Sequence, residues 1–377
     1  MSYRLLRLLG VALAVAVVAT AQVTPELRAR FAHLQHGVNH GPWVDAVADP
    51  QGEVHDVFNA ARAASDIALI AALGFDHVRI NLDPPRMLNI DRPGVLNDAY
   101  LAGLDHCLDL LQAQGLAAVV DMHGLPEYDR RVLGDDRELE ALAASWRTLA
   151  HHLSSRRPGG LFLEVLNEPV SADKYRWAGV QSKLLAAMRA GAPQLTLIAT
   201  GFQWSSLKDL LFLEPVGDPN VIYNFHFYEP LVFTHQGATW SSDFLPLLHG
   251  VPYPLTPETA APLAATLDAG PSRRALLRYA ADGWDAAHIA AVLAPVAAWA
   301  TAHHVLVTCN EFGAFATFAP PTARALWLHD VRTALENDGF GWTMWDYDGG
   351  FHVVQRQPDG TAVADAAIVT ALGLHAH

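Results

Sequence analysis

The chain has 377 residues, of which 51% are hydrophobic and 17% are charged. This composition excludes a disordered protein and a small disulfide-stapled module, and it allows one large domain or two ordinary ones. The formal net charge of −14 lacks the basic surface of a nucleic-acid binder and disfavours an anionic membrane surface, so we expect neither as a partner.

The first 21 residues have the pattern of a secretory signal peptide. An apolar run follows Arg4 and Arg7 and ends at Ala19-Thr20-Ala21, which fits a signal-peptidase cleavage site. The run is shorter than the ~20 residues that a membrane span needs. We therefore predict that residues 1–21 are removed, that residues 22–377 form a single domain, and that the protein is secreted or periplasmic.

Short apolar strands alternate with amphipathic helices along the rest of the chain. Strand patterns cover residues 35–39, 75–81, 117–122, 161–167, 195–200, 221–227, 304–310 and 339–345. Helical periodicity covers residues 58–73, 97–114, 138–153, 172–190, 286–303 and 322–337. Strands that alternate with helices indicate a parallel sheet, and eight of them over this length predict an α/β fold, a single (β/α)₈ TIM barrel.

The alternative is a doubly wound open sheet, but the sequence lacks the Gly-rich phosphate turn that such a sheet would show after an early strand. A long insertion is expected after the sixth strand, over residues 231–285, because the seventh strand begins so late. A long loop at that place in a barrel lies over the active-site face. Cys107 and Cys309, the two cysteines of the chain, are expected to be unpaired core thiols.

Polar residues at the ends of the predicted strands are the candidate site, because reactive residues of such barrels stand at the carboxyl ends of strands. Glu168 ends the fourth strand and Glu311 ends the seventh, so both should face one space. Glycoside cleavage needs two such carboxyls, one protonated to assist the leaving oxygen and one ionised. Arg79 is the cation expected to keep one of them ionised. Glu164 shares the inward side of its strand with Glu168 and is expected to be a structural buried carboxylate.

The chain resembles glycoside hydrolase family 5, a family of retaining (β/α)₈ glycosidases. Leu166-Asn167-Glu168-Pro169 is similar to the fourth-strand signature of that family, and Asn310-Glu311-Phe312-Gly313 is similar to its seventh-strand motif. The recurring residues of the family occur here in the family's order, along the whole chain after the leader: Arg79, His123, Asn167, Glu168, His226, Tyr228, Glu311 and Trp345.

The resemblance implies a catalytic role for two of these residues. Glu168 would be the acid/base, with His226 beside it, and Glu311 would be the nucleophile, held by Arg79 and Tyr228. The two carboxyls would then lie about 5 Å apart, as retention of configuration requires.

The other members would bind the reacting sugar. Asn167 would hold the 2-hydroxyl, His123 would lie near other hydroxyls, and Trp345 would form an apolar floor. Aromatic residues on the loops after strands are further candidates for sugar subsites, with core packing an open alternative for each: Trp43, Tyr128, Trp177, Trp204, Phe233 and Trp240.

In bacterial members of the family, the resemblance implies an endo-β-1,4-glucanase. We expect soluble or amorphous glucan as the substrate, because no carbohydrate-binding module is apparent in the sequence. Mannan, glucomannan and β-1,3-glucan stay open as substrates, because the eight residues hold only the reacting sugar. A non-catalytic carbohydrate-binding barrel is an alternative of a different class. The expected partner is a β-linked polysaccharide or oligosaccharide, the expected state is a monomer, and no cofactor or metal is expected, because the histidines lack the spacing of a metal site.

Overall fold

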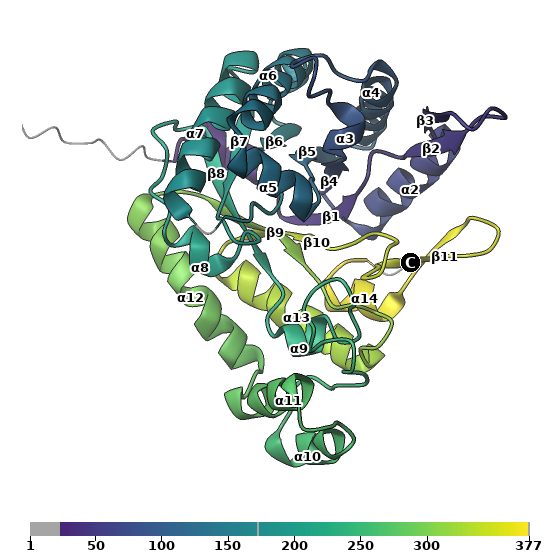
Figure 1. Cartoon of the computed structure of the whole chain (residues 1–377), viewed down its shortest axis with the longest axis vertical. Coiled ribbons are helices and arrows are strands. Elements are labelled where there is room, and N and C mark those ends of the chain that lie inside the picture. Colours follow the sequence, from purple (N-terminus) through teal and green to yellow (C-terminus); the bar gives the residue numbers. More distant parts are fainter. Residues whose placement is uncertain (1–22, 172, 376–377) are drawn as a thin grey trace, which may run out of the picture.

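A computed structural model describes residues 23–171 and 173–375, so the predicted signal peptide lies outside the described residues. Eight parallel strands form a closed barrel in the order β1-β10-β9-β8-β7-β6-β5-β4 (Figure 1). The strands are β1 (His36–His40), β4 (His77–Leu82), β5 (Ala117–Met122), β6 (Leu161–Glu164), β7 (Thr196–Thr200), β8 (Val221–Phe227), β9 (Val307–Phe312) and β10 (Gly341–Met344). The predicted (β/α)₈ barrel is confirmed, and the open-sheet alternative is wrong.

Helices surround the barrel, and the predicted ones are present with small changes at their ends. They are α2 (Ala60–Leu73), α4 (Asp98–Ala113), α6 (Asp136–Leu153), α7 (Lys174–Gly191), α12 (Ala286–His303) and α13 (Pro321–Asn337). Asn and Asp side chains cap the first turns of five of them, which fixes where these helices begin. Gly74 ends α2 at a φ of 93°, a backbone conformation that glycine adopts without strain.

Two hairpins and several short helices lie outside the barrel strands and the helices named above. Two hairpins, β2 (Val44–Ala48) with β3 (Val54–Phe58) and β11 (Val354–Arg356) with β12 (Ala362–Ala364), lie outside the barrel sheet. Short helices are α1 (Pro25–Phe31), α3 (Pro84–Met87), α5 (Pro126–Gly134), α8 (Leu207–Leu210) and α14 (Ala366–Ala371). The stretch between β8 and β9 forms α9 (Leu231–Thr234), α10 (Pro257–Ala265) and α11 (Pro271–Asp282) before α12, and α10 and α11 lie far from the barrel axis (Figure 1).

The barrel interior is layered, and the layering positions the polar residues. Leu27 and Phe31 of α1 pack at the amino-terminal end of the barrel against an apolar layer that includes Val119, Phe162 and Ile222. Side chains two residues further along β5, β6 and β8 point the same way, because strand side chains alternate. These are Asp121, Glu164 and Asn224. A polar layer therefore stands directly above the apolar one, toward the carboxyl ends of the strands.

Both cysteines are buried free thiols, as predicted. Cys107 lies in α4 and Cys309 lies in β9. Among the described residues, only α12 has the length and hydropathy of a membrane span, with a mean hydropathy of 1.3. Alanine supplies much of that hydropathy, and the buried side of α12 includes Ile289, Leu293 and Val296.

Candidate active site

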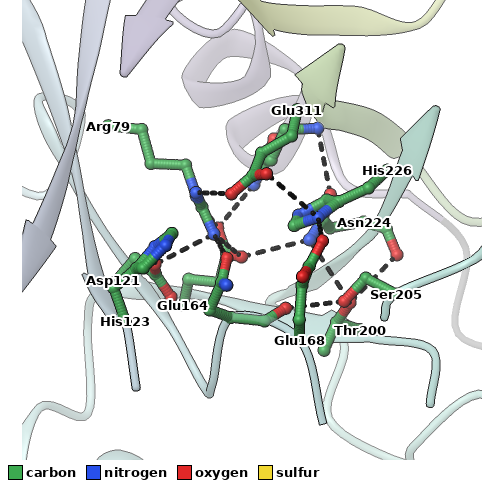
Figure 2. Close-up of polar contacts among 12 residues, drawn as sticks. Arg79, Asp121, His123, Glu164, Glu168, Thr200, Ser205, Asn224, His226 and Glu311 are labelled. Carbon is green, nitrogen blue, oxygen red and sulfur yellow. Dashed lines mark hydrogen bonds and ion pairs between the residues drawn. The ribbon is translucent and has the colours of Figure 1, made fainter. Parts of the chain in front are cut away.

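Arg79 of β4 lies at the centre of the polar layer (Figure 2). Its Nε and Nη2 donate to the two oxygens of Glu164 at 3.0 and 2.8 Å. Nη2 also lies 2.9 Å from Asp121 and donates to Asn167 Oδ1 at 2.8 Å. Nη1 donates to Glu311 Oε1 at 2.8 Å. One guanidinium thus joins residues from β5, β6, β9 and the segment after β6.

The Arg79 side chain is completely buried and yet stays charged. Burial by itself would lower the pKa of the guanidinium, but Asp121, Glu164 and Glu311 outweigh this effect and raise that pKa well above its usual value. A further acceptor, Asn39 Oδ1 of β1, lies 2.9 Å from Nη1. Arg79 is therefore a fixed positive charge beside the predicted nucleophile.

Glu164 has the partners that the sequence left unidentified. Besides the two bonds from Arg79, its oxygens accept hydrogen bonds from Asn224 at 3.1 Å and from Asn310 at 2.6 Å. It is fully buried, as expected. Each of its oxygens accepts hydrogen bonds from two donors, so Glu164 holds the Arg79 guanidinium in place inside the barrel and has no lone pair directed at a substrate.

A bulge in β9 brings two consecutive side chains into the barrel. The pairing register with β8 shifts between Phe225 and His226, so β9 carries one extra residue there. Ordinary alternation would place Asn310 and Glu311 on opposite faces. With the bulge, Asn310 reaches down to Glu164 while Glu311 also faces the interior. Bulges beside active sites re-aim side chains in this way.

Two donors hold the Glu311 carboxylate. Arg79 Nη1 binds Oε1 at 2.8 Å, and the Tyr228 hydroxyl donates to Oε2 at 2.9 Å. Burial, and then the nearby charges of Glu311 and Glu168, raise the pKa of Tyr228 well above its usual value. The phenol therefore stays protonated and remains a donor. Both contacts predicted for Glu311 are present.

Glu168 lies across from Glu311, with His226 between them (Figure 2). His226 Nδ1 lies 2.8 Å from Glu168 Oε1 and 3.5 Å from Glu311 Oε2. Carboxylate oxygens of the two glutamates lie within 4.8 Å of one another. This distance agrees with the separation of about 5 Å expected for two carboxyls that act on one glycosidic bond with retention.

The two carboxyls differ in their surroundings. Burial raises the pKa of Glu168 to about 7, although His123 and Arg79 oppose the shift. Burial lowers the pKa of His226 to about 4, so its ring is neutral near pH 7. Glu168 can therefore hold a proton at mildly acidic to neutral pH, while both oxygens of Glu311 accept hydrogen bonds, from Arg79 and from the Tyr228 hydroxyl. A carboxyl that can hold a proton, opposite a carboxyl fixed by two donors, is suited to acid-assisted nucleophilic substitution.

Asp121, His123 and Trp345 form a second side of the site. Asp121 Oδ2 lies 2.9 Å from His123 Nδ1, and burial raises the pKa of Asp121 to about 7 against the effect of Arg79. The His123 ring stacks on Trp345 at 5.2 Å between ring centroids, with 11° between the planes. Asp121 was not among the predicted site residues. The available signal was its spacing of two residues from His123, which directly follows the end of β5.

An unusual turn after β7 supports the segment that carries Glu168. Gln203, Trp204 and Ser205 all have positive φ values, of 50°, 58° and 51°. The Ser205 hydroxyl donates to the backbone oxygen of Asn167 at 2.6 Å, and the backbone oxygen of Ser205 accepts from the amide of His226 at 2.8 Å. The turn thus ties together the backbones beside both members of the Glu168–His226 pair.

The candidate subsite aromatics fall into two groups. The prediction of Trp43 as a sugar subsite is wrong. Its indole is 1% exposed, donates to Asp66 and stacks on His40, so it cannot stack on a sugar. Trp177 and Phe233 are completely buried and Tyr128 is nearly so. Trp204 and Trp240 remain, with exposed fractions of 54% and 59%.

Trp240 is connected to the site through aromatic contacts. Its ring meets Phe315 edge-on, with 4.9 Å between ring centroids. Phe315 contacts Phe351, which in turn contacts Tyr228. A continuous aromatic wall therefore runs from the hydroxyl that holds Glu311 to an exposed indole.

Three clusters of the described residues have the spacing of a cation site, and one of them, Asp49, Glu53 and His55, lies in and beside the β2–β3 hairpin, where His55 pairs with Asp49. The other two are buried or partly buried. In one of these two, ligand atoms of Glu168, His226 and Glu311 lie within 4.8 Å of one another. Both oxygens of Glu311 are already bound by Arg79 and Tyr228, so this set does not offer a free carboxylate. In the other, His40, Asp66 and Asp348, the guanidinium of Arg356 binds both carboxylates and supplies the positive charge.

Comparisons with known proteins agree with this geometry. Residues 44–350 match the sequence profile described as "Cellulase (glycosyl hydrolase family 5)". Endoglucanase C of Acetivibrio thermocellus is 28% identical over 317 residues, which cover 82% of this chain and 90% of that protein. A hyperthermophilic endo-β-1,4-glucanase, solved in complex with substrate, superposes with a TM-score of 0.72 at 24% identity and covers 92% of this chain and 99% of its own. Thermotoga maritima Cel5A in complex with mannotriose gives 0.69 at 22% identity, over 91% of this chain and 98% of its own.

Proposed function

Because the chain belongs to the cellulase family, glycoside hydrolase family 5, we propose that it hydrolyses internal β-1,4-glucan bonds by a retaining double displacement. The observation that carries this proposal is the pair of unlike carboxyls, Glu168 and Glu311, with oxygens within 4.8 Å of one another. The match to endoglucanases supports the choice of β-1,4-glucan.

In the first step, Glu311 attacks the anomeric carbon of the bound sugar while Glu168 gives its proton to the departing glycosidic oxygen. The bond from the anomeric carbon to that oxygen breaks, and an ester of Glu311 forms. In the second step, the ionised Glu168 takes a proton from water, whose oxygen attacks the same carbon and releases Glu311. Two inversions at one carbon retain its configuration.

Neighbouring groups stabilise the charge that develops in these steps. Asn167 turns its amide oxygen toward Arg79, so its amide nitrogen is available to donate to the 2-hydroxyl of the reacting sugar. That hydrogen bond strengthens as the ring approaches an oxocarbenium ion. The indole of Trp345, backed by the stacked ring of His123, provides an apolar surface for the C–H face of the same sugar.

The test is reducing-sugar release from carboxymethyl-cellulose, mixed-linkage glucan, glucomannan, mannan and laminarin. We expect hydrolysis of the β-1,4-glucans, with a β-configured first product by NMR. Glu311→Gln should abolish the activity, because an amide cannot form the glycosyl ester. An α-configured first product would contradict the retaining mechanism, and silence of the wild-type protein on every polymer would contradict the function itself.

A second substrate class is β-mannan. The Thermotoga relative was solved with mannotriose, and the residues around Glu168 and Glu311 hold one sugar without selecting its neighbours. Activity confined to mannan or glucomannan would keep the mechanism and replace the substrate.

We further propose that the enzyme acts outside the cytoplasm as a monomer and that residues 231–285 are an insertion beside the active site. The leader sequence of residues 1–21 supports export. N-terminal sequencing of exported protein should find Gln22, and finding Met1 would contradict cleavage.

The aromatic contacts from Trp240 to Tyr228 support a role for the insertion in substrate binding. Trp240→Ala should therefore raise KM on polymers.

A further inference from the structure

Three exposed aromatic residues lie near the start of α7 and around α8. Tyr175 is in the first turn of α7 and is 77% exposed, Phe212 follows α8 and is 62% exposed, and Trp204 precedes α8. We call Trp204, Tyr175 and Phe212 the aromatic ledge. Exposed aromatic rings of this size give up the free energy that burial would provide, so a group of them marks a binding surface.

A lysine connects two members of the ledge. Lys174 Nζ lies 4.6 Å from the centre of the Phe212 ring and 5.3 Å from the centre of the Tyr175 ring. The two rings therefore flank one ammonium group, although they come from segments far apart in the sequence. Apolar ring faces beside a cationic donor match a sugar, which has C–H faces and hydroxyl acceptors.

The ledge is fixed to the backbone that carries the acid/base. Trp204 belongs to the positive-φ turn, in which Ser205 donates to the backbone oxygen of Asn167, the residue before Glu168. The start of α7 is held against the carboxyl end of β7, just before this turn, because Trp177 Nε1 donates to the backbone oxygen of Thr200 at 2.9 Å. Both segments therefore extend from the acid/base side of the site.

The position of the acid/base determines which part of a substrate would reach this surface. Glu168 protonates the departing oxygen, so the leaving half of a glycan extends past Glu168, and the half that becomes the ester stays over Glu311. We propose that Tyr175 and Phe212, with Lys174 between them, bind the distal sugars of the leaving half of a β-linked glycan chain. This inference rests on the proposed glycosidase function, and it adds a binding surface to that site.

The experiment compares substrates of different length in Tyr175→Ala, Phe212→Ala and the double variant. With mixed-linkage glucan, kcat/KM should fall about fivefold for each ring, because an aromatic contact of this kind contributes on the order of 1 kcal/mol. The effect should lie mainly in KM. With 4-nitrophenyl β-cellobioside, whose leaving group is a single small ring, the loss should stay below about twofold.

Leu326→Ala is the matched control, because Leu326 is an exposed apolar residue of α13, away from the ledge. It should behave as wild type on both substrates. Affinity electrophoresis in gels that contain the glucan gives a readout without catalysis, and the double variant in a Glu311→Gln background should be retarded less than Glu311→Gln alone.

Equal losses of kcat/KM on the short and long substrates would contradict sugar binding by the aromatic ledge. Unchanged retardation and kinetics in the double variant would contradict it as well. Failure of the wild-type protein to hydrolyse either substrate would instead overturn the proposed function. The two failures are therefore distinguishable.

Discussion

Arg79 controls the charge balance at the residue scale. One guanidinium faces three buried carboxyls, those of Asp121, Glu164 and Glu311. Three ionised carboxylates around one cation would leave excess negative charge in a buried space, which is costly. Burial raises the pKa of Asp121 to about 7 against the effect of Arg79, so this carboxyl can carry a proton at mildly acidic pH and reduce the excess. Arg79 thus links the protonation of Asp121 to Glu311, the proposed nucleophile.

Glu164→Gln tests whether the anchor below Arg79 matters for catalysis. The substitution keeps the shape but removes the charge that binds Nε and Nη2, so Arg79 should be less well aimed at Glu311. We expect kcat to fall about tenfold to a hundredfold with KM little changed, because the transition state is affected more than binding. Steady-state kinetics measures this split, and a raised KM at unchanged kcat would contradict the positioning role.

The pKa of Glu168 predicts the basic limb of the pH profile. The acid must be protonated in the first step, and burial raises its pKa to about 7, so kcat/KM should decline as pH rises through about 7. Glu168→Gln should lose most of its kcat/KM on glucan but little of its kcat/KM on 2,4-dinitrophenyl β-cellobioside, whose leaving group needs no proton. Its kcat on that substrate should still fall, because hydrolysis of the glycosyl ester then lacks its base. The wild-type protein should show no such decline of kcat/KM with rising pH on the activated substrate. If its kcat/KM on that substrate also declines near pH 7, a group other than Glu168 causes the decline.

At the scale of elements, the hydrophobic pattern of the sequence predicted the strands and helices of the barrel but not the two hairpins outside it. Strands 117–122 and 221–227 and helix 286–303 were predicted with the bounds that the structure has, because buried runs and amphipathic periods are local signals. The hairpins β2–β3 and β11–β12 were not predicted, since much of each is exposed and gives no apolar pattern.

The site shows the same division. The residues that meet at the carboxyl ends, and the contacts of Arg79 and Tyr228 with Glu311, could be predicted from motifs, but the backbone features that position them could not. The bulge at Asn310 depends on pairing with two neighbouring strands, and the burial of Trp43 depends on Asp66 and His40, so neither has a signal in the local sequence. Asp121 did have a local signal, its spacing from His123.

Helix α5 carries a buried carboxyl without a partner. Asp129 is 1% exposed, and neither of its side-chain oxygens has a hydrogen-bond partner among the described residues. Burial, with added repulsion from Glu168 and Asp121, raises its pKa well above the usual value. An ionised Asp129 is therefore penalised in the folded state but not in the unfolded one.

Asp129→Asn should accordingly stabilise the protein at neutral pH. The folded pKa lies above the unfolded value of about 3.9, so wild type loses stability as pH rises above about 4, and the variant does not. We expect a gain on the order of 1–2 kcal/mol in the free energy of unfolding at pH 7, shrinking toward pH 4. Urea unfolding at both pH values checks this, and a gain that is equal at both would contradict the titration.

At the scale of the whole molecule, β1 closes the barrel by pairing with β4 on one side and β10 on the other. His77 of β4 reaches across Gly37 of β1, where Nε2 lies 2.8 Å from the hydroxyl of Thr343 in β10. A Cβ at Gly37 would overlap the imidazole ring of His77. The closing strand therefore needs glycine there because of a close approach from inside the barrel.

Gly37→Ala should lower the free energy of unfolding by roughly 2–4 kcal/mol, because the His77 ring must move and a buried hydrogen bond is lost. Gly41→Ala is the control, since nothing lies within 4 Å of a Cβ there. Chemical denaturation of both variants measures the difference. Similar stabilities for the two would show that the closing strand tolerates the methyl group.

The contacts of Arg79 also have a consequence for how activity appears during refolding. The guanidinium of β4 binds side chains of β1, β5, β6 and β9, so its environment is complete only when strands from both ends of the chain have met. Helix content can recover earlier, because helices depend on near neighbours in sequence. Catalytic turnover should therefore return after the far-UV circular dichroism signal when denaturant is removed, because turnover requires the closed barrel and that signal reports only secondary structure. Fragments that lack either terminal strand, however helical, should be inert.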